Sequence, residues 1–525
     1  MKKIINPFSQ LSSILAVAVL LLGTTACHDK LNAPLENKEY TEETDYSVSA
    51  NMISPLVGAY AELYKRGWED FAVISVRGDD VNAGGLGDQQ PYSDADRFRY
   101  DNTFWMFNQM WSNFYSSIFK LNSAIEQINR YRDAGANAAL ANQYVAEVTV
   151  MRAWYLLNLA RTFGGIFVPE TADNTELFAT PLRPYDEVMQ IIAEQLDQTL
   201  AVLPNMHPRS RSDIKGGVTK YTALALKAVA LLEKKDYSGV AAATSQIIAS
   251  GFFSLEQDFY ELFKLTKGKL NPENVFEFQY SDYGTPSGDE NQFAANSFVG
   301  PQKGDGTGFL PENTLIGGGW GFYEPSMKFI KFMLDRGERI RLKTAVLFTN
   351  RGLDSLKKVY PGITVPEWMT DHTGLDGRSG DRILNFQRAV FSSGKHYIPS
   401  KQIVSGRTSY NSGRNQVIIR YAEILLMHAE ALTRGASSSA MTADAAVNAL
   451  RTRAGLGSLS GVTAEQVMDE KFAELAMEWG VRFYDMARLE KHGELSYEGR
   501  TFTAGLKYIP YPQAQLDMFP ILKEK

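Results

Sequence analysis

The sequence predicts a mostly helical protein: a helical scaffold with tetratricopeptide-like helix hairpins, long irregular loops and a few short strands. Three observations predict this fold class. Apolar residues recur with helical spacing, alanine-rich helices follow one another in pairs, and polar, glycine-containing stretches separate these helices. Apolar residues make up 44% of the 525 residues, so the chain can bury a large core.

The clearest single helix lies between residues 144 and 160. Its apolar stripe has offsets of four, three, four and four residues, and consists of Tyr144, Val148, Met151, Tyr155 and Leu159. Gly164 and Gly165 are expected to end this helix, because glycine favours the backbone conformation at a helix C-terminus. A second helix is expected over about 185–203, ending before Pro204.

Two pairs of helices carry many alanines, which let antiparallel helices approach closely. The first pair is predicted over about 219–233 and 238–249, and the second over about 417–433 and 444–453. A last helix is predicted over 464–479, because Thr463 and Gln466 have the spacing of a capping box. These pairs indicate tetratricopeptide-like hairpins.

Long irregular segments are expected at about 79–110, 281–325 and 352–413. Loops of this length are uncommon in compact domains unless they serve a function. A short strand is expected over 275–280, where phenylalanine alternates with polar residues. Residues 44–525 are expected to form one domain.

The N-terminal residues are expected to direct export. Lys2 and Lys3 precede an apolar run over 14–22, which is the size of a signal-peptide core and too short to span a bilayer comfortably. Residues 1–26 are therefore predicted to be a lipoprotein signal peptide, with Cys27 as the lipidated residue and 27–43 as a tether. Plain cleavage, which leaves Cys27 unmodified, is the alternative, because Thr24 stands where lipoproteins usually have leucine.

Composition and motifs exclude several functions. A single cysteine rules out an intrachain disulfide and cysteine-ligated zinc or iron–sulfur sites, and the net charge of −6 argues against broad nucleic-acid binding. The chain has no P-loop, G-x-S-x-G or H-E-x-x-H motif. We expect no catalytic residues, cofactor or metal, although a structural cation in an acidic loop stays open.

Aromatic residues in the long loops are the candidate ligand-binding residues. Sugars present apolar C–H faces, which flat aromatic rings cover. Three rings between glycines are expected to project from their loop, namely Trp320, Phe322 and Tyr323, although Trp320 can equally fold back into the core. Further candidates are Tyr283, Tyr92 and Trp68, whereas Trp105, Trp111 and Trp154 have helical spacing and are expected in the core.

An acidic pair, Asp79 and Asp80, stands at the start of the first long loop. The pair is a candidate for binding a sugar or a cation. Adjacent acids at the start of a loop more often cap a turn, which is the structural alternative.

The order of several short motifs resembles the SusD/RagB family of Bacteroidetes outer-membrane lipoproteins. The resemblance covers nearly the whole chain and is stronger in the C-terminal half. The matching segments include 56–61, 77–81, 151–155, 163–165, 273–276, 420–426, 453–456, 474–476 and 509–513. Trp479-Gly480-Val481-Arg482 departs from the family pattern, which often has Glu-Gly-x-Arg.

The resemblance implies an outer-membrane lipoprotein, anchored through Cys27 and facing the cell exterior. Such proteins bind a nutrient glycan and deliver it to a partner TonB-dependent transporter of the SusC type, without catalysis or nucleic-acid binding. Two alternative functions stay open: a peptide-binding member of the same family, and a secreted helical glycoside hydrolase. A third is a pure scaffold that binds other proteins. The motif charges, such as Arg420 and Arg482, are expected to form ion pairs within the scaffold.

Overall fold

The structure is a computed structural model of the chain. It describes residues 44–64, 68–87, 89–281, 298–304, 307–311, 317–369, 378, 380–385, 389–404, 410 and 412–524. The predicted signal peptide, Cys27 and the predicted tether lie outside the described residues, as does Tyr283.

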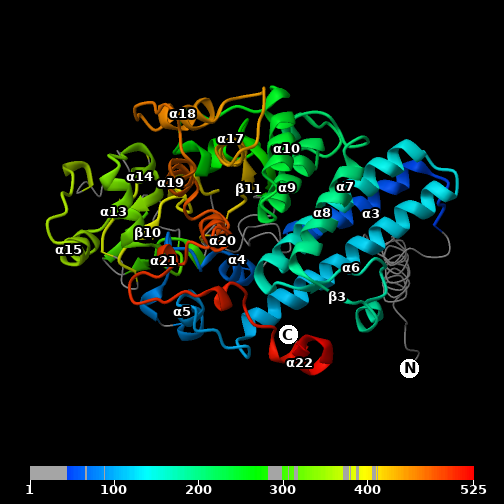
Figure 1. Cartoon of the computed structure of the whole chain (residues 1–525), viewed down its shortest axis with the longest axis horizontal. Coiled ribbons are helices and arrows are strands. Elements are labelled where there is room, and N and C mark those ends of the chain that lie inside the picture. Colours follow the sequence, from blue (N-terminus) through cyan, green and yellow to red (C-terminus); the bar gives the residue numbers. More distant parts are fainter. Residues whose placement is uncertain are drawn as a thin grey trace, which may run out of the picture.

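The described chain is mostly helical, as predicted (Figure 1). The α-helices are α3 Ile53–Tyr64, α4 Trp68–Ser75, α5 Gln90–Asp96, α6 Trp105–Asp133, α7 Ala138–Phe163, α8 Tyr185–Thr199, α9 Lys220–Glu233, α10 Tyr237–Ala249, α11 Leu265–Gly268, α13 Met327–Asp335, α14 Ile340–Ala345, α15 Asn350–Val359, α17 Tyr421–Thr433, α18 Ala443–Arg453, α19 Ala464–Leu475, α20 Val481–Arg488, α21 His492–Leu495 and α22 Gln513–Met518. None of them is long and apolar enough to cross a membrane, within the part of the chain that the structure describes.

Successive helices pack in a continuous series. Helix α6 packs on α7, α7 on α8, α8 on α9, α9 on α10, and α10 on α17, which also contacts α18 and α19. Figure 1 shows α3, α6, α7 and α8 side by side at one end of the molecule, and α13, α14 and α15 at the other. One cluster of buried apolar residues extends along the chain from Met52 to Leu522.

The predicted helix boundaries are confirmed where a capping residue sets them. Helix α7 ends at Gly164, whose φ of 83° is open to glycine and strained for other residues. Helices α9 and α19 begin with capping boxes at Thr219 and Thr463. At Thr463 the hydroxyl accepts from Gln466 N–H at 3.2 Å, and at Thr219 the backbone N–H donates to the Thr222 hydroxyl at 3.2 Å.

Three helix predictions are wrong at one end, and the first is the helix expected over about 185–203, which already ends at Thr199. The helix expected over 417–433 begins at Tyr421, because Val417, Ile418 and Ile419 form strand β11, as β-branched residues favour. The helix expected to end at residue 479 stops at Leu475, since the backbone of Met477 turns to a φ of 64° and its N–H donates to Asp80 Oδ2 at 2.6 Å.

The strands are short and pair across distant parts of the sequence. They are β1 Val81–Gly84, β2 Ile166–Phe167, β3 Leu182–Arg183, β4 Asn274–Phe278, β5 Lys303–Gly304, β6 Thr307–Leu310, β7 Phe322–Pro325, β8 Val346–Leu347, β9 Arg382–Ile383, β10 Ser392–Ser393 and β11 Gln416–Arg420. All pairs are antiparallel: β1 with β7, β2 with β3, β4 with β11, β8 with β10, and β6 with both β5 and β9.

The segments expected to be irregular contain more regular structure than predicted. The first holds β1, the 3₁₀-helix η2 Gly85–Gly87, α5 and the start of α6, and the third begins inside α15. Trp111 and Trp154 are buried, as expected. The prediction for Trp105 is wrong, because this residue begins α6 and its side chain is 49% exposed.

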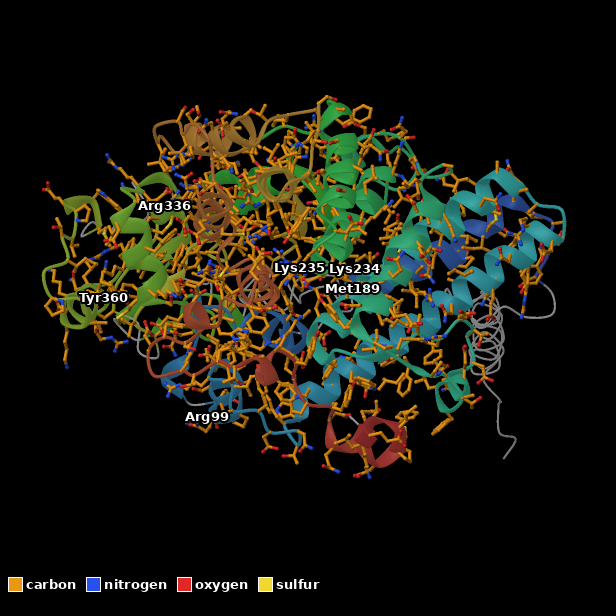
Figure 2. All side chains as sticks on the ribbon, in the orientation of Figure 1. Arg99, Met189, Lys234, Lys235, Arg336 and Tyr360 are labelled. Carbon is orange, nitrogen blue, oxygen red and sulfur yellow. The ribbon has the colours of Figure 1, made fainter. Side chains whose placement is uncertain are left out.

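A buried ionic network ties the C-terminal helices to the rest of the scaffold. The carboxylate of Glu474 in α19 accepts from three arginines: Arg341 at 3.1 Å, Arg420 at 2.5 Å, and Arg453. Nearby, Arg336 donates to Glu470 at 2.6 Å, and Figure 2 shows Arg336 on the side of the molecule where α13 and α14 lie. The motif arginines are therefore structural, as expected: Arg420 is part of this network, and Arg482 pairs with Asp79.

Candidate functional site

Residues 317–321 form a turn that leads into β7. Three backbone hydrogen bonds hold this turn: Gly319 N–H donates to Pro301 at 2.8 Å, Gly321 N–H to Gly300 at 3.1 Å, and Gly85 N–H to the Gly321 carbonyl at 3.2 Å. A Cβ atom at Gly319 would lie 2.4 Å from the Gly300 carbonyl oxygen, so only glycine fits there. The backbone on both sides of Trp320 is therefore fixed.

Trp320 is the aromatic residue that this turn presents to solvent. Its side chain is 44% exposed, and its ring meets that of Phe298 edge to face, with 6.3 Å between the centroids. The sequence left open whether the Trp320 side chain projects into solvent or is buried in the core, and in the structure it projects. A fixed, half-exposed indole is suited to stacking on a flat apolar face of a ligand.

The other aromatic candidates near this turn are buried. The expectation that Phe322 and Tyr323 project is wrong: they are 5% and 0% exposed, because β7 is paired with β1 and covered on both faces. Phe322 stacks on Phe298 with centroids 4.8 Å apart, and Tyr92, itself 1% exposed, packs edge-on against Phe298. Phe298 therefore connects the Trp320 ring with the buried rings of Phe322 and Tyr92. Trp68 begins α4, but its side chain lies outside the described residues.

Asp79 and Asp80 are buried and have partners within the protein. Asp79 accepts from Arg482 Nε at 2.6 Å and pairs with Lys328 at 2.7 Å. Burial raises the pKa of Asp79, but the charge of Arg482 outweighs this and lowers it below its ordinary value. Burial raises the pKa of Asp80 to about 6. Both acids are therefore engaged within the scaffold, Asp79 by ion pairs and Asp80 by accepting from Met477 N–H, and ligand contact by either acid stays a prediction.

Beside the turn lies a polar cleft of about 440 Å³. Its lining residues come from β1, α5, β7 and the C-terminal segment: Asn82, Ala83, Gly84, Gly87, Gln90, Ser93, Asp96, Arg97, Glu324, Glu498 and Arg500. The cleft adjoins Trp320 through the backbone, because Gly84 pairs with Phe322 and Gly85 with Gly321. In Figure 1 this region is near α5, and Figure 2 labels Arg99 there, just beyond the C-terminus of that helix.

Arg500 organises the buried wall of this cleft. Its guanidinium pairs with Asp96 Oδ2 at 2.9 Å, and the same carboxylate oxygen accepts from Ala83 N–H at 2.9 Å. The second oxygen, Asp96 Oδ1, is buried and has no hydrogen-bond partner among the described residues. Glu324 uses one oxygen, Oε1, to accept from Val390 N–H at 2.7 Å and Phe391 N–H at 2.9 Å.

Burial governs the protonation of these acids. It raises the pKa of Asp96 to about 6 and that of Glu324 to about 7, and it also raises the pKa of Glu498. The cleft therefore offers carboxyl acceptors, protonated carboxyl donors and arginine N–H groups side by side. Such a mixture is suited to a neutral ligand with many hydroxyl groups.

Sequence reasoning missed Asp96, Glu324, Glu498 and Arg500. They come from three segments up to 404 residues apart, and no motif joins them. Within the described part of the chain, no group of histidine, cysteine and acidic residues has the geometry to hold a metal ion.

Two family models match this chain. The SusD family model matches residues 272–517, and a second model, described as "Starch-binding associating with outer membrane", matches residues 35–232. The chain belongs to the SusD family. The family resemblance of the motifs is thereby confirmed.

Relatives of this SusD-family protein match over most of its length. "SusD-like protein P2" of Formosa agariphila is 26% identical over 497 residues, covering 91% of this chain and 90% of the relative. Surface glycan-binding protein A from Bacteroides fluxus has a TM-score of 0.70 at 23% identity, covering 90% of this chain and 97% of that one. Surface glycan-binding protein A from Bacteroides thetaiotaomicron, solved with laminarihexaose, has a TM-score of 0.70 at 21% identity, covering 89% and 97%. The helical fold is that of SusD-like proteins.

Proposed function

We propose that this protein binds a nutrient glycan at the surface formed by Trp320 and the adjoining polar cleft. The observation that carries the proposal is the half-exposed indole of Trp320, fixed in a turn whose backbone is hydrogen-bonded to Gly85 beside a cleft with mixed donors and acceptors. An aromatic ring covers the C–H face of a sugar, and the polar groups bind its hydroxyls. Family members described as surface glycan-binding proteins support this assignment.

We further propose that Cys27 carries a lipid anchor that holds the protein at the outer face of the outer membrane. The protein would then deliver its glycan to a TonB-dependent transporter of the SusC type. The outer-membrane association in the description of the second family model supports this location.

Titration calorimetry over a panel of soluble glycans, beginning with laminarin oligosaccharides and starch oligosaccharides, tests the binding proposal. We expect saturable binding of at least one glycan and unchanged ligand after prolonged incubation. Binding of peptides alone would favour the peptide-binding alternative within the family. Failure to bind either class would overturn the proposal.

One observation favours a second candidate, a glycoside hydrolase. Asp96, Glu324 and Glu498 bring three carboxyl groups with raised pKa values to one cleft, and glycoside hydrolysis needs two facing carboxyls. Against it, Asp96 is paired with Arg500, and Glu324 Oε1 is occupied by two backbone N–H groups. Chromatography of the incubated glycans separates the two: products that disappear in Glu324→Gln would establish the hydrolase.

A further inference from the structure

The polar cleft holds more carboxyl groups than cations. Three acids and two arginines line it: Asp96, Glu324, Glu498, Arg97 and Arg500. Arg500 is committed to the protein, because its guanidinium pairs with Asp96 at 2.9 Å and donates to the Val81 carbonyl at 3.3 Å. Within the described part of the chain, neither Glu324 nor Glu498 forms an ion pair with a lysine or an arginine. Two carboxyls of the cleft are therefore without a direct counter-charge.

The Glu324 carboxyl is held in place by the backbone around it. The residue is 8% exposed, and its Oε1 accepts from the N–H groups of Val390 and Phe391. On the neighbouring strand β1, Asn82 lies opposite Glu324, and the side-chain oxygen of Asn82 accepts from Arg500. These contacts fix the carboxyl in the wall of the cleft.

Charged groups from several parts of the fold act on the Glu324 carboxyl, but burial has the largest effect. Burial raises the pKa of Glu324 to about 7, although the two backbone N–H groups lower it; the charge of Glu498 raises this pKa further, and that of Arg351 in α15 lowers it. Burial also raises the pKa of Glu498. The other charged residues that line the cleft are Asp96, the exposed Arg97 and Arg500. Loss of water therefore outweighs the nearby positive charge.

A sugar that fills this cleft displaces the water that stabilises the ionised carboxyls. A neutral ligand brings no cation in exchange, so the carboxyls bind protons more tightly in the complex than in the free protein. We propose that glycan binding at this cleft takes up protons through Glu324, an inference that rests on the glycan-binding function proposed above. The affinity is then highest near pH 6 and falls as the pH rises toward 8.5.

Titration calorimetry at pH 7 in phosphate and in Tris tests this proposal, because the two buffers release protons with different enthalpies. The probe is the uncharged panel glycan that binds most tightly, with laminarihexaose tested first. We expect the difference between the two binding enthalpies to correspond to uptake of about half a proton, since Glu324 is about half ionised at pH 7. The affinity should fall at least about threefold from pH 6 to pH 8.5.

Equal binding enthalpies in the two buffers, release of protons, or an affinity that does not change with pH would overturn the proposal. Failure of every panel glycan to bind at any pH would contradict the glycan-binding function itself, and this inference with it. Binding without proton uptake would contradict only the inference. The buffer comparison uses the wild-type protein, so it does not depend on the folding of a variant.

Glu324→Gln removes the titrating group but keeps its size and an acceptor oxygen. This variant should lose most of the pH dependence of the affinity and most of the proton uptake. The matched control is Glu423→Gln: burial also raises the pKa of Glu423 to about 7, but this residue is in α17 and does not line the cleft. The control should keep the proton uptake of the wild type, with circular dichroism checking the fold of both variants. Equal losses of proton uptake in the two variants would overturn the assignment to the cleft.

Discussion

Replacing Glu474 by Gln tests whether the buried ionic network holds the C-terminal helices in place. The Glu474 side chain is 0% exposed, and its two carboxylate oxygens accept from Arg341, Arg420 and Arg453. Glutamine keeps the shape but removes the charge and turns two N–H donors toward arginines. Arg341 and Arg420 keep other carboxylate partners, among them Glu338 for Arg341, so the network is weakened rather than abolished.

The expected loss follows from what breaking a buried ion pair costs, about 3–5 kcal/mol. Unfolding entropy near 60 °C is about 2.1 cal/mol/K per residue, or roughly 1 kcal/mol/K for a domain of this size, so the melting temperature should fall by about 3–5 °C. Differential scanning calorimetry measures it. The control is Glu465→Gln on the same helix, an exposed residue that pairs with Lys491 at 3.3 Å and should change stability by less than about 1 kcal/mol. A Glu474→Gln melting temperature equal to that of this control would show that the Glu474 charge does not stabilise the C-terminal helices.

Three further predictions concern the site and its anchor. Gly319→Ala should weaken glycan binding about tenfold, because the added Cβ collides with the Gly300 carbonyl and displaces Trp320. The control is Gly457→Ala, whose Cβ meets no atom within 4 Å and which should bind as the wild type does. Equal affinities of the two variants in calorimetry would contradict this prediction. Burial raises the folded-state pKa of Glu324 to about 7, so this carboxyl lowers stability as the pH rises from about 4.5 to 7. In chemical denaturation, the free energy of unfolding of Glu324→Gln should therefore rise by about 2–3 kcal/mol relative to that of the wild type between pH 5 and pH 8. Parallel pH profiles of the two free energies would exclude this. Cys27→Ala should move the protein from the membrane fraction to the soluble fraction and abolish labelling by a fatty-acid analogue, and retained labelling would rule out this cysteine as the anchor.

The helices could be predicted from local signals, since apolar periodicity and capping residues act within a few turns. Gly164, Thr219 and Thr463 set boundaries that the structure confirms. The errors arise where tertiary pairing decides. Residues 417–419 are apolar and could be part of a helix or of a strand, and pairing with β4 makes them a strand.

The candidate site was less predictable for the same reason. Glycines around Trp320, Phe322 and Tyr323 indicate a turn, but pairing of β7 with β1 determines that only the first ring is exposed. The polar cleft depends on the ion pair between Arg500 and Asp96, which are 404 residues apart in the sequence, and no local sequence pattern predicts that contact. Ligand contact by Tyr283 and Trp68 stays a prediction.

In our proposal, the Trp320 ring is the platform on which a glycan stacks. The most direct measurement compares the glycan affinity of Trp320→Ala with that of Trp105→Ala by titration calorimetry, using one glycan that binds the wild type. Both tryptophans are similarly exposed, at 44% and 49%, but Trp320 lies in the turn that is hydrogen-bonded to Gly85 beside the polar cleft, whereas Trp105 begins α6. We expect a loss of about 1–3 kcal/mol of binding free energy for Trp320→Ala and none for Trp105→Ala. Unchanged affinity in Trp320→Ala, or an equal loss in both variants, would contradict it.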